Sequence, residues 1–489
     1  MKAKLLIIGA GPSGLAAGER LIDSSFQDFI ILEARHRIGG RINSILQGSS
    51  YIELGAQWIH GEEGNVTYGI AKAQDLLSRG KDGSSQFMLD EASEWSNVLF
   101  LRSDGSALMD SSSRKIGFVT SMMESMELGL DCDEYRSAGN HHVAAFNEML
   151  QENRFHELQA EREAILDWIH RYINSVDAAD DWEQVANANT YWRCPGNTNV
   201  CLEPKLGYVS VLNHLKRKFG DQHLMLGKEV TEINYSNKSI IAVTCADGTR
   251  FECQKCILTL PLGVLKNRPG IFVPSLPQRK KDAIDALGFG AVDKIFLIFK
   301  TRWWPETAGG GFSFLWTNEP EPEYQLAIIR WNERKKFCTL FQGWPRSLLG
   351  FYADPGYENV LCGWISGDGA RAMEKVPVEK VEYVCVALLR KFTRGLNLDI
   401  PEPVAIHRST WGSDEFSRGS YSYRSVVCDE KGIGAVDLAE PVCDGSENRL
   451  YFAGEATHSN FYSTVHGAIE TGYREADRFI EDEKRDLLK

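Results

Sequence analysis

The stretch Leu5-Leu6-Ile7-Ile8-Gly9-Ala10-Gly11-Pro12-Ser13-Gly14 decides the fold of this chain. Its four leading residues form a short apolar run of the kind that becomes a buried parallel strand. Of the three glycines, the first allows a tight turn, the second lets a pyrophosphate approach the backbone, and the third lets helix and strand pack closely. Helix-forming residues 15–21 come next, and the start of such a helix attracts phosphate through its N–H groups and dipole. The stretch therefore predicts a nucleotide-binding β-α-β unit.

A second apolar run, Phe29–Leu32, ends at Glu33, 19 residues after Gly14. An acid at this place holds ribose hydroxyls and disfavours a 2′-phosphate. The alternative, a glycine-rich turn in an ordinary core, leaves the glycines and the acid unexplained. Six residues past Glu33, Gly39-Gly40-Arg41 adds a second close-approach glycine pair, with an arginine able to pair with phosphate. A nicotinamide site does not need this second element, so we predict FAD.

The composition excludes several classes of protein. The 489 residues suffice for two or more domains, and a hydrophobic share of 43% with a charged share of 25% is ordinary for a globular protein. The net charge is −13 and no block of lysine or arginine occurs, which argues against nucleic acid and suits a cationic small substrate. No run of about 20 apolar residues is present, so we expect no transmembrane helix and no membrane partner.

The ends of the chain and its cysteines predict a cytosolic (cytoplasmic) location. The apolar N-terminus lacks a charged leader and is already used by the nucleotide motif, so we expect no secretory signal. Residues 485–489 do not form a peroxisomal Ser-Lys-Leu address. The 11 cysteines are scattered and odd in number, as expected for reduced thiols. Cys253 and Cys256 form a C-x-x-C pair, but no second pair or histidine set completes a zinc site, so we expect an ordinary strand and no metal.

The order of elements predicts an α/β protein with two discontinuous domains. A polar stretch, residues 78–140, and a predicted helix at 161–169 separate the opening unit from later strands. Two of these strands, residues 240–245 and 255–260, frame a turn at Asp247-Gly248-Thr249. Because strand-rich segments return after an excursion, we expect a nucleotide domain and a substrate domain that alternate along the chain. The first is predicted to comprise residues 1–77, 206–290 and 405–489, and the second residues 78–205 and 291–404.

Six separated blocks of this sequence, in the same order, resemble the flavin amine oxidase family, and within it the polyamine oxidases of the spermine and N1-acetylpolyamine type. They are residues 9–33, 39–41, 53–61, 288–294, 418–423 and 452–468. The resemblance runs from the first strand to the last helix, although residues 78–205 are not distinctive. It implies a Rossmann-type FAD-binding domain interleaved with a substrate-binding domain of mixed sheet flanked by helices.

The resemblance also implies which residues bind the cofactor. Glu455 would hold a ribityl hydroxyl, with helix capping as the alternative, and Val230 would grip adenine through its backbone. The backbone of Thr464 and Val465 would face the flavin ring, and the following helix, residues 467–479, would add its dipole. The full predicted set is Gly9, Gly11, Gly14, Glu33, Arg35, Gly40, Arg41, Gly55, Ala56, Gln57, Trp58, Val230, Trp411, Glu455, Thr464 and Val465.

Lys294 leads the apolar run Ile295-Phe296-Leu297. In the family a lysine at this place holds a water against the flavin N5, which makes Lys294 the foremost catalytic candidate. An ammonium in a site of low dielectric should have a lowered pKa. The alternative is a lysine that protects a strand edge from aggregation. The flanking Gly288–Asp293 motif favours the catalytic role.

Four further residues bear on the substrate. His60 falls where the spermine and acetylpolyamine types carry histidine at the catalytic tunnel, although a lone histidine is often a core or surface residue. Tyr421 matches one wall of an aromatic cage that attracts cationic nitrogen. The second wall, a tyrosine in several relatives, falls at Thr464, so the chain departs from the monoamine oxidases. Tyr208 is a further substrate-side candidate, with core packing as its alternative.

Three more positions complete the prediction. Ser420 stands where monoamine oxidases carry a flavin-linking cysteine, so FAD should bind non-covalently. Trp411 is expected beside the flavin, and Trp364 is either a pocket or a core aromatic.

The implied reaction is oxidation of a polyamine at a secondary amine by hydride transfer to flavin N5, giving an aldehyde, a shorter amine and hydrogen peroxide. Spermine and N1-acetylated spermine or spermidine remain open as substrates, with oxygen as the second reactant. The alternatives are another substrate on the same fold (an L-amino acid or methyl-lysine) and a non-catalytic flavin-binding scaffold. The oligomeric state stays open.

Overall fold

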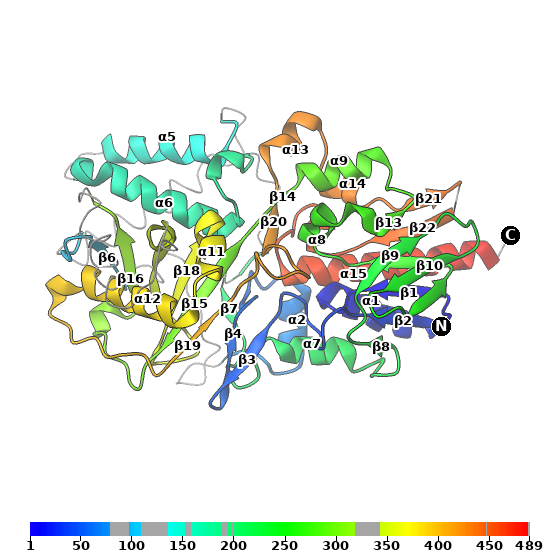
Figure 1. Ribbon diagram of the computed structural model, residues 1–489, viewed down its shortest axis with the longest axis horizontal. Helices are drawn as coiled ribbons and strands as arrows, with labels where there is room; N and C mark the ends of the chain where they lie inside the picture. Colours follow the sequence, from blue (N-terminus) through cyan, green and yellow to red (C-terminus); the bar gives the residue numbers. More distant parts are fainter. Residues whose placement is uncertain are drawn as a thin grey trace. The chain divides into compact units, whose positions relative to one another are not determined.

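The computed structural model describes residues 1–78, 97–108, 135–151, 158–187, 191, 194–196, 199–317, 343–445 and 447–487 (Figure 1). The chain forms two compact units. The first comprises residues 1–90, 184–290 and 414–489, and the second residues 91–183 and 291–413. Most of the polar stretch 78–140 lies outside the described residues.

The boundaries of these units differ from the predicted ones at three places, the first being that the opening segment of the first unit runs to residue 90 rather than 77. Residues 184–205 belong to the first unit, where β7 (Val200–Cys201) pairs with β5 (Trp58–Ile59). Residues 405–413 belong to the second unit, because β19 (Ala405–Arg408) pairs with β15 (Val292–Ile298). Strand pairing between distant segments decides both assignments, and no local pattern in the sequence reports it.

The first unit is built on a six-stranded sheet in which β1 (Leu5–Ile8) lies between β12 (Lys255–Leu258) and β2 (Phe29–Leu32), parallel to both. All four residues of β1 are buried. Leu5 and Ile7 face one hydrophobic core and Leu6 and Ile8 the other, as expected for a strand that is covered on both faces. The remaining strands of the sheet are β8 (Leu224–Met225), β21 (Val442–Asp444) and β22 (Glu447–Phe452).

Two helices from opposite ends of the chain pack together in this unit. They are α1 (Pro12–Asp23) and α15 (Val465–Leu487), drawn in blue and red in Figure 1. A Cβ at Gly472 would lie 2.1 Å from the carbonyl oxygen of Ser13, so only glycine allows this approach. The helix predicted at residues 467–479 is present as α15, which is longer at both ends.

A smaller four-stranded sheet adjoins the main sheet, and here the predicted hairpin is wrong in its second strand. The turn after β10 (Ile241–Cys245) leads into β11 (Arg250–Cys253), which pairs with β10. Only Gln254 separates β11 from β12, and β12 joins the main sheet beside β1. Cys253 and Cys256 thus lie in different strands, both buried. The sheet is completed by β9 (Val230–Asn234) and β13 (Phe272–Val273).

Shorter elements complete the first unit. Its hairpin and ribbon strands are β3 (Ser44–Gln47), β4 (Ser50–Glu53), β14 (Gly288–Gly290) and β20 (Tyr421–Tyr423). Its other helices are α2 (Val66–Ala73), α7 (Val209–Lys216), α8 (Leu262–Asn267), α9 (Gln278–Ala286), α13 (Val426–Lys431) and α14 (Ala435–Ala439).

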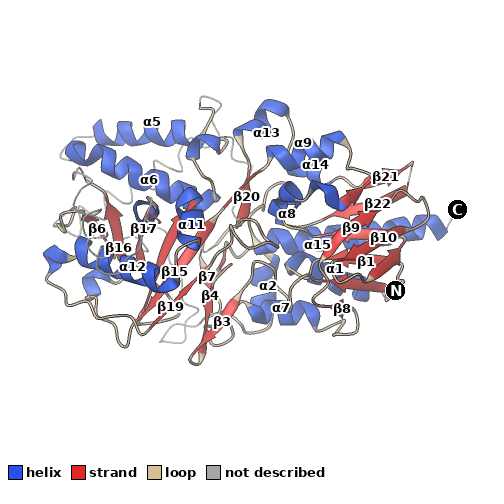
Figure 2. Ribbon diagram, viewed as in Figure 1, coloured by secondary structure: helices blue, strands red, loops and turns tan. Residues whose placement is uncertain are grey.

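The second unit is a mixed six-stranded sheet with helices on its faces (Figure 2). Its strand order is β19-β15-β18-β17-β16-β6, antiparallel except for the β16–β6 pair. Ile295 and Leu297 of β15 pack into a core shared with α11 and α12, and a second core lies around Trp168 of α6. The other elements are β6 (Val98–Arg102), β16 (Gly311–Leu315), β17 (Leu348–Ala353), β18 (Val360–Ser366), α5 (Ala138–Gln151), α6 (Arg162–Asp177), α11 (Gly367–Glu374) and α12 (Val378–Phe392).

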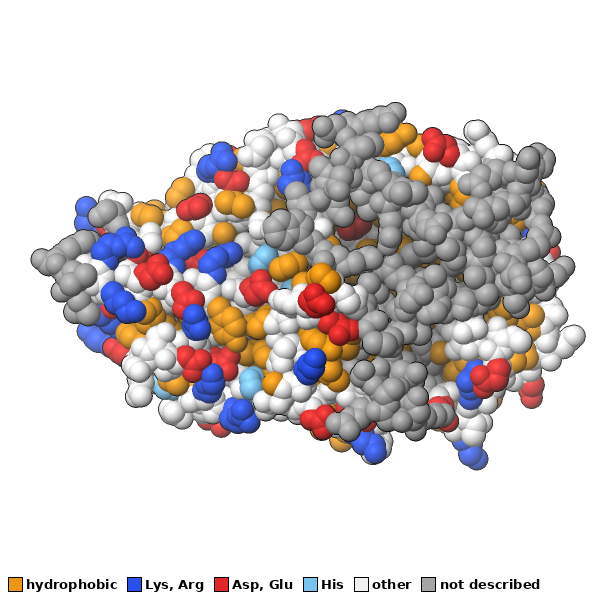
Figure 3. Space-filling model, turned by 180° about the vertical axis from the view of Figure 1, so that it is seen from behind, with side chains coloured by type: hydrophobic (Ala, Val, Ile, Leu, Met, Phe, Trp, Pro, Cys, Tyr) orange, Lys and Arg blue, Asp and Glu red, His pale blue; other side chains and the backbone are white. Residues whose placement is uncertain are grey.

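The two architectures confirm the predicted α/β fold class, with a Rossmann-type sheet that is parallel except for β21 and a mixed sheet flanked by helices. Among the described helices, none combines the length and hydropathy needed to cross a bilayer. Figure 3 shows lysine, arginine, aspartate and glutamate side chains interspersed over the coloured part of one face. This mixing leaves no extended field of one sign on that coloured part.

Candidate active site

The three glycines after β1 have three different environments. Gly9 has a φ of +110°, in the region that favours glycine, and makes the turn. A Cβ at Gly14 would lie 2.0 Å from the carbonyl oxygen of Gly9, so α1 packs on the turn only because this residue is glycine. A Cβ at Gly11 would meet no heavy atom within 4 Å. Gly11 is the N-cap of α1 and has no side-chain cap, so this open side of the turn suits an approaching phosphate.

Glu33 closes the same edge of the sheet. Its Oε2 accepts the N–H of Ala10 at 2.8 Å, and its Oε1 accepts the N–H of Arg35 at 2.9 Å. Burial raises the pKa of this carboxyl, and the two N–H bonds oppose that rise. The carboxylate is thus held beside the glycine turn, where its remaining lone pairs can accept ribose hydroxyls.

The segment predicted to grip adenine runs beside Glu33. The N–H of Lys228 donates to the carbonyl of Glu33 at 2.8 Å, and the N–H of Gly227 to that of Arg35 at 2.9 Å. Val230 follows as the first residue of β9 and is buried. The ribose-binding and adenine-binding candidates therefore adjoin one another.

The second glycine pair forms a loop fixed by an arginine that the sequence analysis did not select. Arg37 donates to the carbonyls of Ile38, Gly40 and Ile42 at 2.9–3.1 Å. Gly39 and Gly40 both have positive φ, +104° and +57°. A Cβ at Gly40 would lie 3.6 Å from the Cα of Gly11, so the two glycine loops lie next to each other.

Arg35 has a structural partner in the protein. Its guanidinium forms a bidentate pair with Asp414 at 2.6 and 2.8 Å and also donates to the hydroxyl of Ser417 at 3.1 Å. This pair holds the segment that follows residue 413 to the end of β2. The predicted cofactor contact of Arg35 is therefore not needed to explain the residue.

Arg41 and Glu455 form the polar end of a pocket. Arg41 Nη1 lies 2.7 Å from Glu455 Oε1, and it also donates to the carbonyl of Ser420 at 2.9 Å. The other carboxylate oxygen of Glu455 accepts from the hydroxyl of Ser422 at 2.6 Å and from the N–H of Ser463 at 2.8 Å. The carboxylate therefore binds Arg41, Ser422 and Ser463, and it does not cap the 3-10 turn Glu455–Thr457 to which Glu455 belongs.

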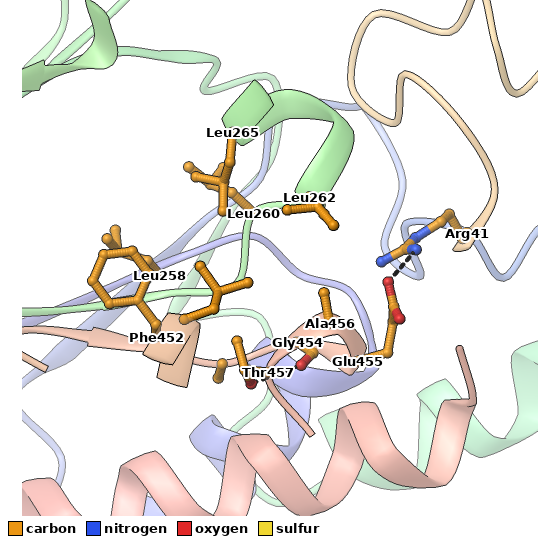
Figure 4. Close-up of a pocket in the computed structure, with 12 residues that line it drawn as sticks. Arg41, Leu258, Leu260, Leu262, Leu265, Phe452, Gly454, Glu455, Ala456 and Thr457 are labelled. Carbon is orange, nitrogen blue, oxygen red and sulfur yellow. Dashed lines mark hydrogen bonds and ion pairs between the residues drawn. The ribbon is translucent and has the colours of Figure 1, made fainter. Parts of the chain in front are cut away.

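Apart from Thr457 and the backbone of Gly454, the rest of this pocket is apolar. Figure 4 shows Arg41 and Glu455 facing each other, with leucine side chains and Phe452 to one side. The apolar lining comprises Leu258, Leu260, Leu262, Leu265, Leu438 and Phe452. The pocket opens at the carboxyl ends of β12 and β22, the edge at which parallel α/β sheets bind their ligands.

Thr464 is the residue from which α15 starts. Its hydroxyl accepts the N–H of Gly467 at 3.0 Å and donates to the carbonyl of Phe461 at 2.7 Å. A Cβ at Gly467 would lie 1.9 Å from that same carbonyl oxygen. Thr464 and Val465 thus sit at the positive end of a 23-residue helix, which fits their predicted place beside an electron-rich ring.

The motif around residues 53–61 packs against Arg41 and Tyr208. The N–H of Ala56 donates to the carbonyl of Arg41 at 3.3 Å, so this backbone follows the second glycine loop. Glu53 accepts the N–H of Tyr208 at 2.7 Å. Tyr208 is only 1% exposed and directs its hydroxyl to the carbonyl of Trp58, which favours the core-packing alternative, and its substrate contact stays a prediction. Gly55, Gln57 and Trp58 stay cofactor predictions.

His60 belongs to a group that contains two residues the sequence analysis missed. The Oδ1 of Asn65 accepts the N–H groups of Thr67 and Tyr68, which makes its Nδ2 a donor. That Nδ2 donates to the carbonyl of His60 at 2.9 Å and lies 3.4 Å from Nδ1 of His466. His466 must therefore accept at Nδ1 and carry its proton on Nε2. Burial, with His60 and His458 nearby, lowers the pKa of His466 to about 3.

Three predicted site residues lie in the second unit: Lys294, Trp364 and Trp411. Lys294 pairs across the sheet with Trp364, and its Nζ lies 4.9 Å from the centre of that ring. The side chain is buried, and β15 lies between β19 and β18. Lys294 is therefore an interior lysine, and the strand-edge alternative is wrong.

The remaining candidates are described in the first unit. Tyr421 begins β20 and pairs with Gly290, and the N–H of Ser420 donates to the carbonyl of Gly290 at 2.7 Å. Tyr421 is half-buried and Ser420 is buried. Their roles as cage wall and as the position without a flavin-linking thiol stay predictions.

The chain is similar to known amine oxidases over its whole length. Residues 12–480 match the family described as flavin containing amine oxidoreductase. The chain is 31% identical to the peroxisomal N(1)-acetyl-spermine/spermidine oxidase of Homo sapiens, across 98% of this chain and 94% of that protein. It is 28% identical to probable polyamine oxidase 5 of Arabidopsis thaliana, across 99% of each. A solved structure of putrescine oxidase bound to putrescine has the same fold, with a TM-score of 0.65, 19% identity, and coverage of 98% and 99%.

Proposed function

The chain belongs to the flavin-containing amine oxidoreductase family, and we propose that within it the chain is an FAD-dependent polyamine oxidase. The proposed substrates are spermine and its N1-acetylated forms, together with N1-acetylspermidine. The observation that carries the proposal is identity of 31% across nearly the full length of a protein named for oxidation of acetylated spermine and spermidine. The family's cofactor is FAD, and polyamine catabolism with release of hydrogen peroxide is the activity we assign.

The residues of the first unit fit this cofactor. The open turn at Gly11 and the start of α1 would hold the pyrophosphate, and Glu33 the adenosine ribose. The Arg41–Glu455 pocket would hold the middle of the molecule, and the Thr464 end of α15 the flavin ring. Ser420 offers a hydroxyl rather than a thiol, so attachment would be non-covalent. When bound, FAD supplies the two-electron acceptor that the protein's own side chains lack.

The protein's share of the reaction is orientation and proton control. We assign Lys294 the task of holding a water at the reacting centre, from a buried position against Trp364. His60 would bind a substrate nitrogen and favour its neutral form, because only a neutral amine can give up hydride from the adjacent carbon. Tyr421 would form an apolar and π-electron wall for the chain of methylenes and cationic nitrogens. Water then converts the oxidised amine into an aldehyde and a shorter amine.

The proposal is tested by mixing the FAD-loaded protein anaerobically with one amine at a time and recording the flavin absorbance. We expect fast bleaching with spermine or N1-acetylspermine, slow or no bleaching with putrescine, and none with benzylamine, which lacks the remote cationic nitrogens. Bleaching by benzylamine, by an L-amino acid or by a methyl-lysine peptide in preference to the polyamines would overturn the substrate class. A yellow protein that none of these amines reduces would overturn the enzymatic proposal.

We also propose the cytosol as the location, although the human relative's name assigns that protein to the peroxisome. A fluorescent protein fused at either end in turn, imaged beside a peroxisomal marker, decides this. Diffuse signal from both fusions is expected. Punctate signal that coincides with the marker would overturn the location and leave the enzymatic proposal unaffected.

A further inference from the structure

Three consecutive backbone N–H groups in the second unit are bound by two carboxylates. The N–H of Trp411 donates to Oδ1 of Asp293 at 3.0 Å. The next two, Gly412 and Ser413, donate to Oε1 and Oε2 of Glu374, each at 2.7 Å. Because adjacent amides bind them, the two carboxyl groups must lie side by side. Asp293 is the second residue of β15, and Glu374 is the last residue of α11.

Asp293 also joins this segment to the strand that carries Lys294. Its Oδ1 accepts the hydroxyl of Ser409 at 2.7 Å, and the same hydroxyl accepts the N–H of Lys294 at 2.9 Å. The N–H of Ser409 returns a bond to the carbonyl of Lys294 at 3.0 Å. The carboxyl group of Asp293, the residue just before Lys294, therefore binds the segment 409–411, and Ser409 of that segment binds the backbone of Lys294.

The second oxygen of Asp293 has no hydrogen-bond partner among the described residues, although the residue is 0% exposed. A buried carboxylate oxygen without a partner is costly, so an ionised Asp293 is disfavoured. Both oxygens of Glu374 accept N–H groups, which suits the ionised form. A proton on Oδ2 of Asp293, donated to Glu374, satisfies every polar atom of the pair. In agreement, burial and the neighbouring Glu374 raise the pKa of Asp293 to about 8.

The charged groups around Asp293 and Glu374 also favour a single negative charge on the pair. Arg408 of β19 faces both carboxyl groups, but it donates to the carbonyl oxygens of Met373 and Glu374. Arg371 of α11 approaches Gly412 and is bound to Asp180 and Asp368. Arg408 also faces Glu379, so it balances at most one negative charge of the pair, and a proton balances the other.

We propose that Asp293 and Glu374 share one proton, and that this shared proton positions residues 409–413, with Trp411, against the strand that carries Lys294. The inference rests on the proposed function only for the roles of Lys294 and Trp411 at the flavin. Asp293 and Glu374 are positioning residues, since they act through the segment they bind. Loss of the proton places two like charges side by side in a buried site and releases the segment.

The first test needs no substrate. Asp293→Asn keeps an acceptor for Ser409 and Trp411 and a donor for Glu374, without a group that titrates. The unfolded chain releases the proton of Asp293 near the ordinary pKa of 3.8, whereas the folded chain keeps it to about 8. The folded chain therefore binds more protons in that window, and wild-type stability falls relative to the variant as pH rises. The Tm of Asp293→Asn minus that of wild type should thus increase from pH 5 to 8 and then level off.

The second test uses the rate of anaerobic flavin bleaching by the best amine. We expect the ratio of wild type to Asp293→Asn to be flat below about pH 8 and to fall above it, because only wild type loses the shared proton. Asp293→Leu, which keeps the branched shape of the side chain but cannot bind Ser409 or Trp411, should be slow at every pH. Glu374→Gln should be slow as well, since one of two backbone N–H groups loses its acceptor.

Two results would overturn the proposal. A Tm difference between wild type and Asp293→Asn that does not change with pH would show that Asp293 is ionised. Equal bleaching rates for Asp293→Leu and Asp293→Asn would show that the segment needs no such clamp. The Tm experiment does not depend on activity. It therefore tests the shared proton even if the proposed function is wrong.

Discussion

At the scale of single residues, Lys294 shows how a neighbouring motif and a buried environment combine. The ammonium has the ring of Trp364 at 4.9 Å and lies in a strand with a partner on either side. Because Lys294 is buried in an interior strand, it cannot protect a sheet edge against aggregation. This buried position supports the proposed role of Lys294 in proton control.

Replacement of Lys294 by methionine should leave FAD bound and slow either bleaching by the amine or reoxidation by oxygen. Methionine keeps most of the contact with Trp364 and removes the charged nitrogen, so the loss is chemical. General acid–base groups contribute about 10²–10⁴-fold, and we expect the low end of that range. Stopped-flow traces of both half-reactions measure it. Lys300→Met, an exposed lysine just beyond the end of β15, is the matched control. Unchanged rates in both half-reactions would remove Lys294 from the mechanism.

At the scale of elements, two glycines of the turn after β1 have different roles: Gly14 is needed for packing, and Gly11 is proposed to bind phosphate. Alanine at Gly14 drives a methyl group against the carbonyl oxygen of Gly9, and overpacking of this kind costs about 1–3 kcal/mol. That cost exceeds the gain of about 1 kcal/mol that alanine brings to a helix interior. Alanine at Gly11 meets no atom of the protein within 4 Å. The two substitutions should therefore act on different properties.

We expect Gly14→Ala to lower the Tm of the protein without cofactor, and Gly11→Ala to leave that Tm unchanged and weaken FAD binding. Differential scanning fluorimetry without FAD and fluorescence titration with FAD measure the two effects. Should Gly11→Ala bind FAD as wild type does, the phosphate would not approach at this glycine.

At the scale of the whole molecule, FAD should stabilise the folded chain by mass action. A ligand at 100 times its Kd adds about 2.7 kcal/mol when it binds only the folded state. Tm should therefore rise with FAD concentration and stay constant with NADH, which has no use for the Gly39-Gly40 loop. Glu33→Ala should reduce the FAD shift, because the ribose loses its acceptor. An equal shift with NADH would contradict the assignment of the second glycine loop to FAD.

Much of the first unit is predictable from local sequence. The run 5–8, the three glycines and Glu33 specify a strand, a turn, a helix and a second strand through contacts within about 30 residues. The hairpin prediction was wrong because β11 and β12 are separated by one residue and belong to different sheets. When no turn residue separates two strands, the hydrophobic pattern does not show where one strand ends and the next begins.

The sequence by itself determined the family, the cofactor class and the two kinds of sheet, and it singled out Lys294 as the catalytic candidate, since each depends on residue types at short spacing. Tertiary structure alone decided that Asn65 joins His60 to His466, that Arg35 is bound to Asp414, and that Tyr208 is packed in the core. It also brought Asp293 beside Glu374, 81 positions apart along the chain, at one set of backbone amides. These arrangements depend on pairings between distant segments, and the energy of a buried charge or an unsatisfied donor exists only once those segments meet.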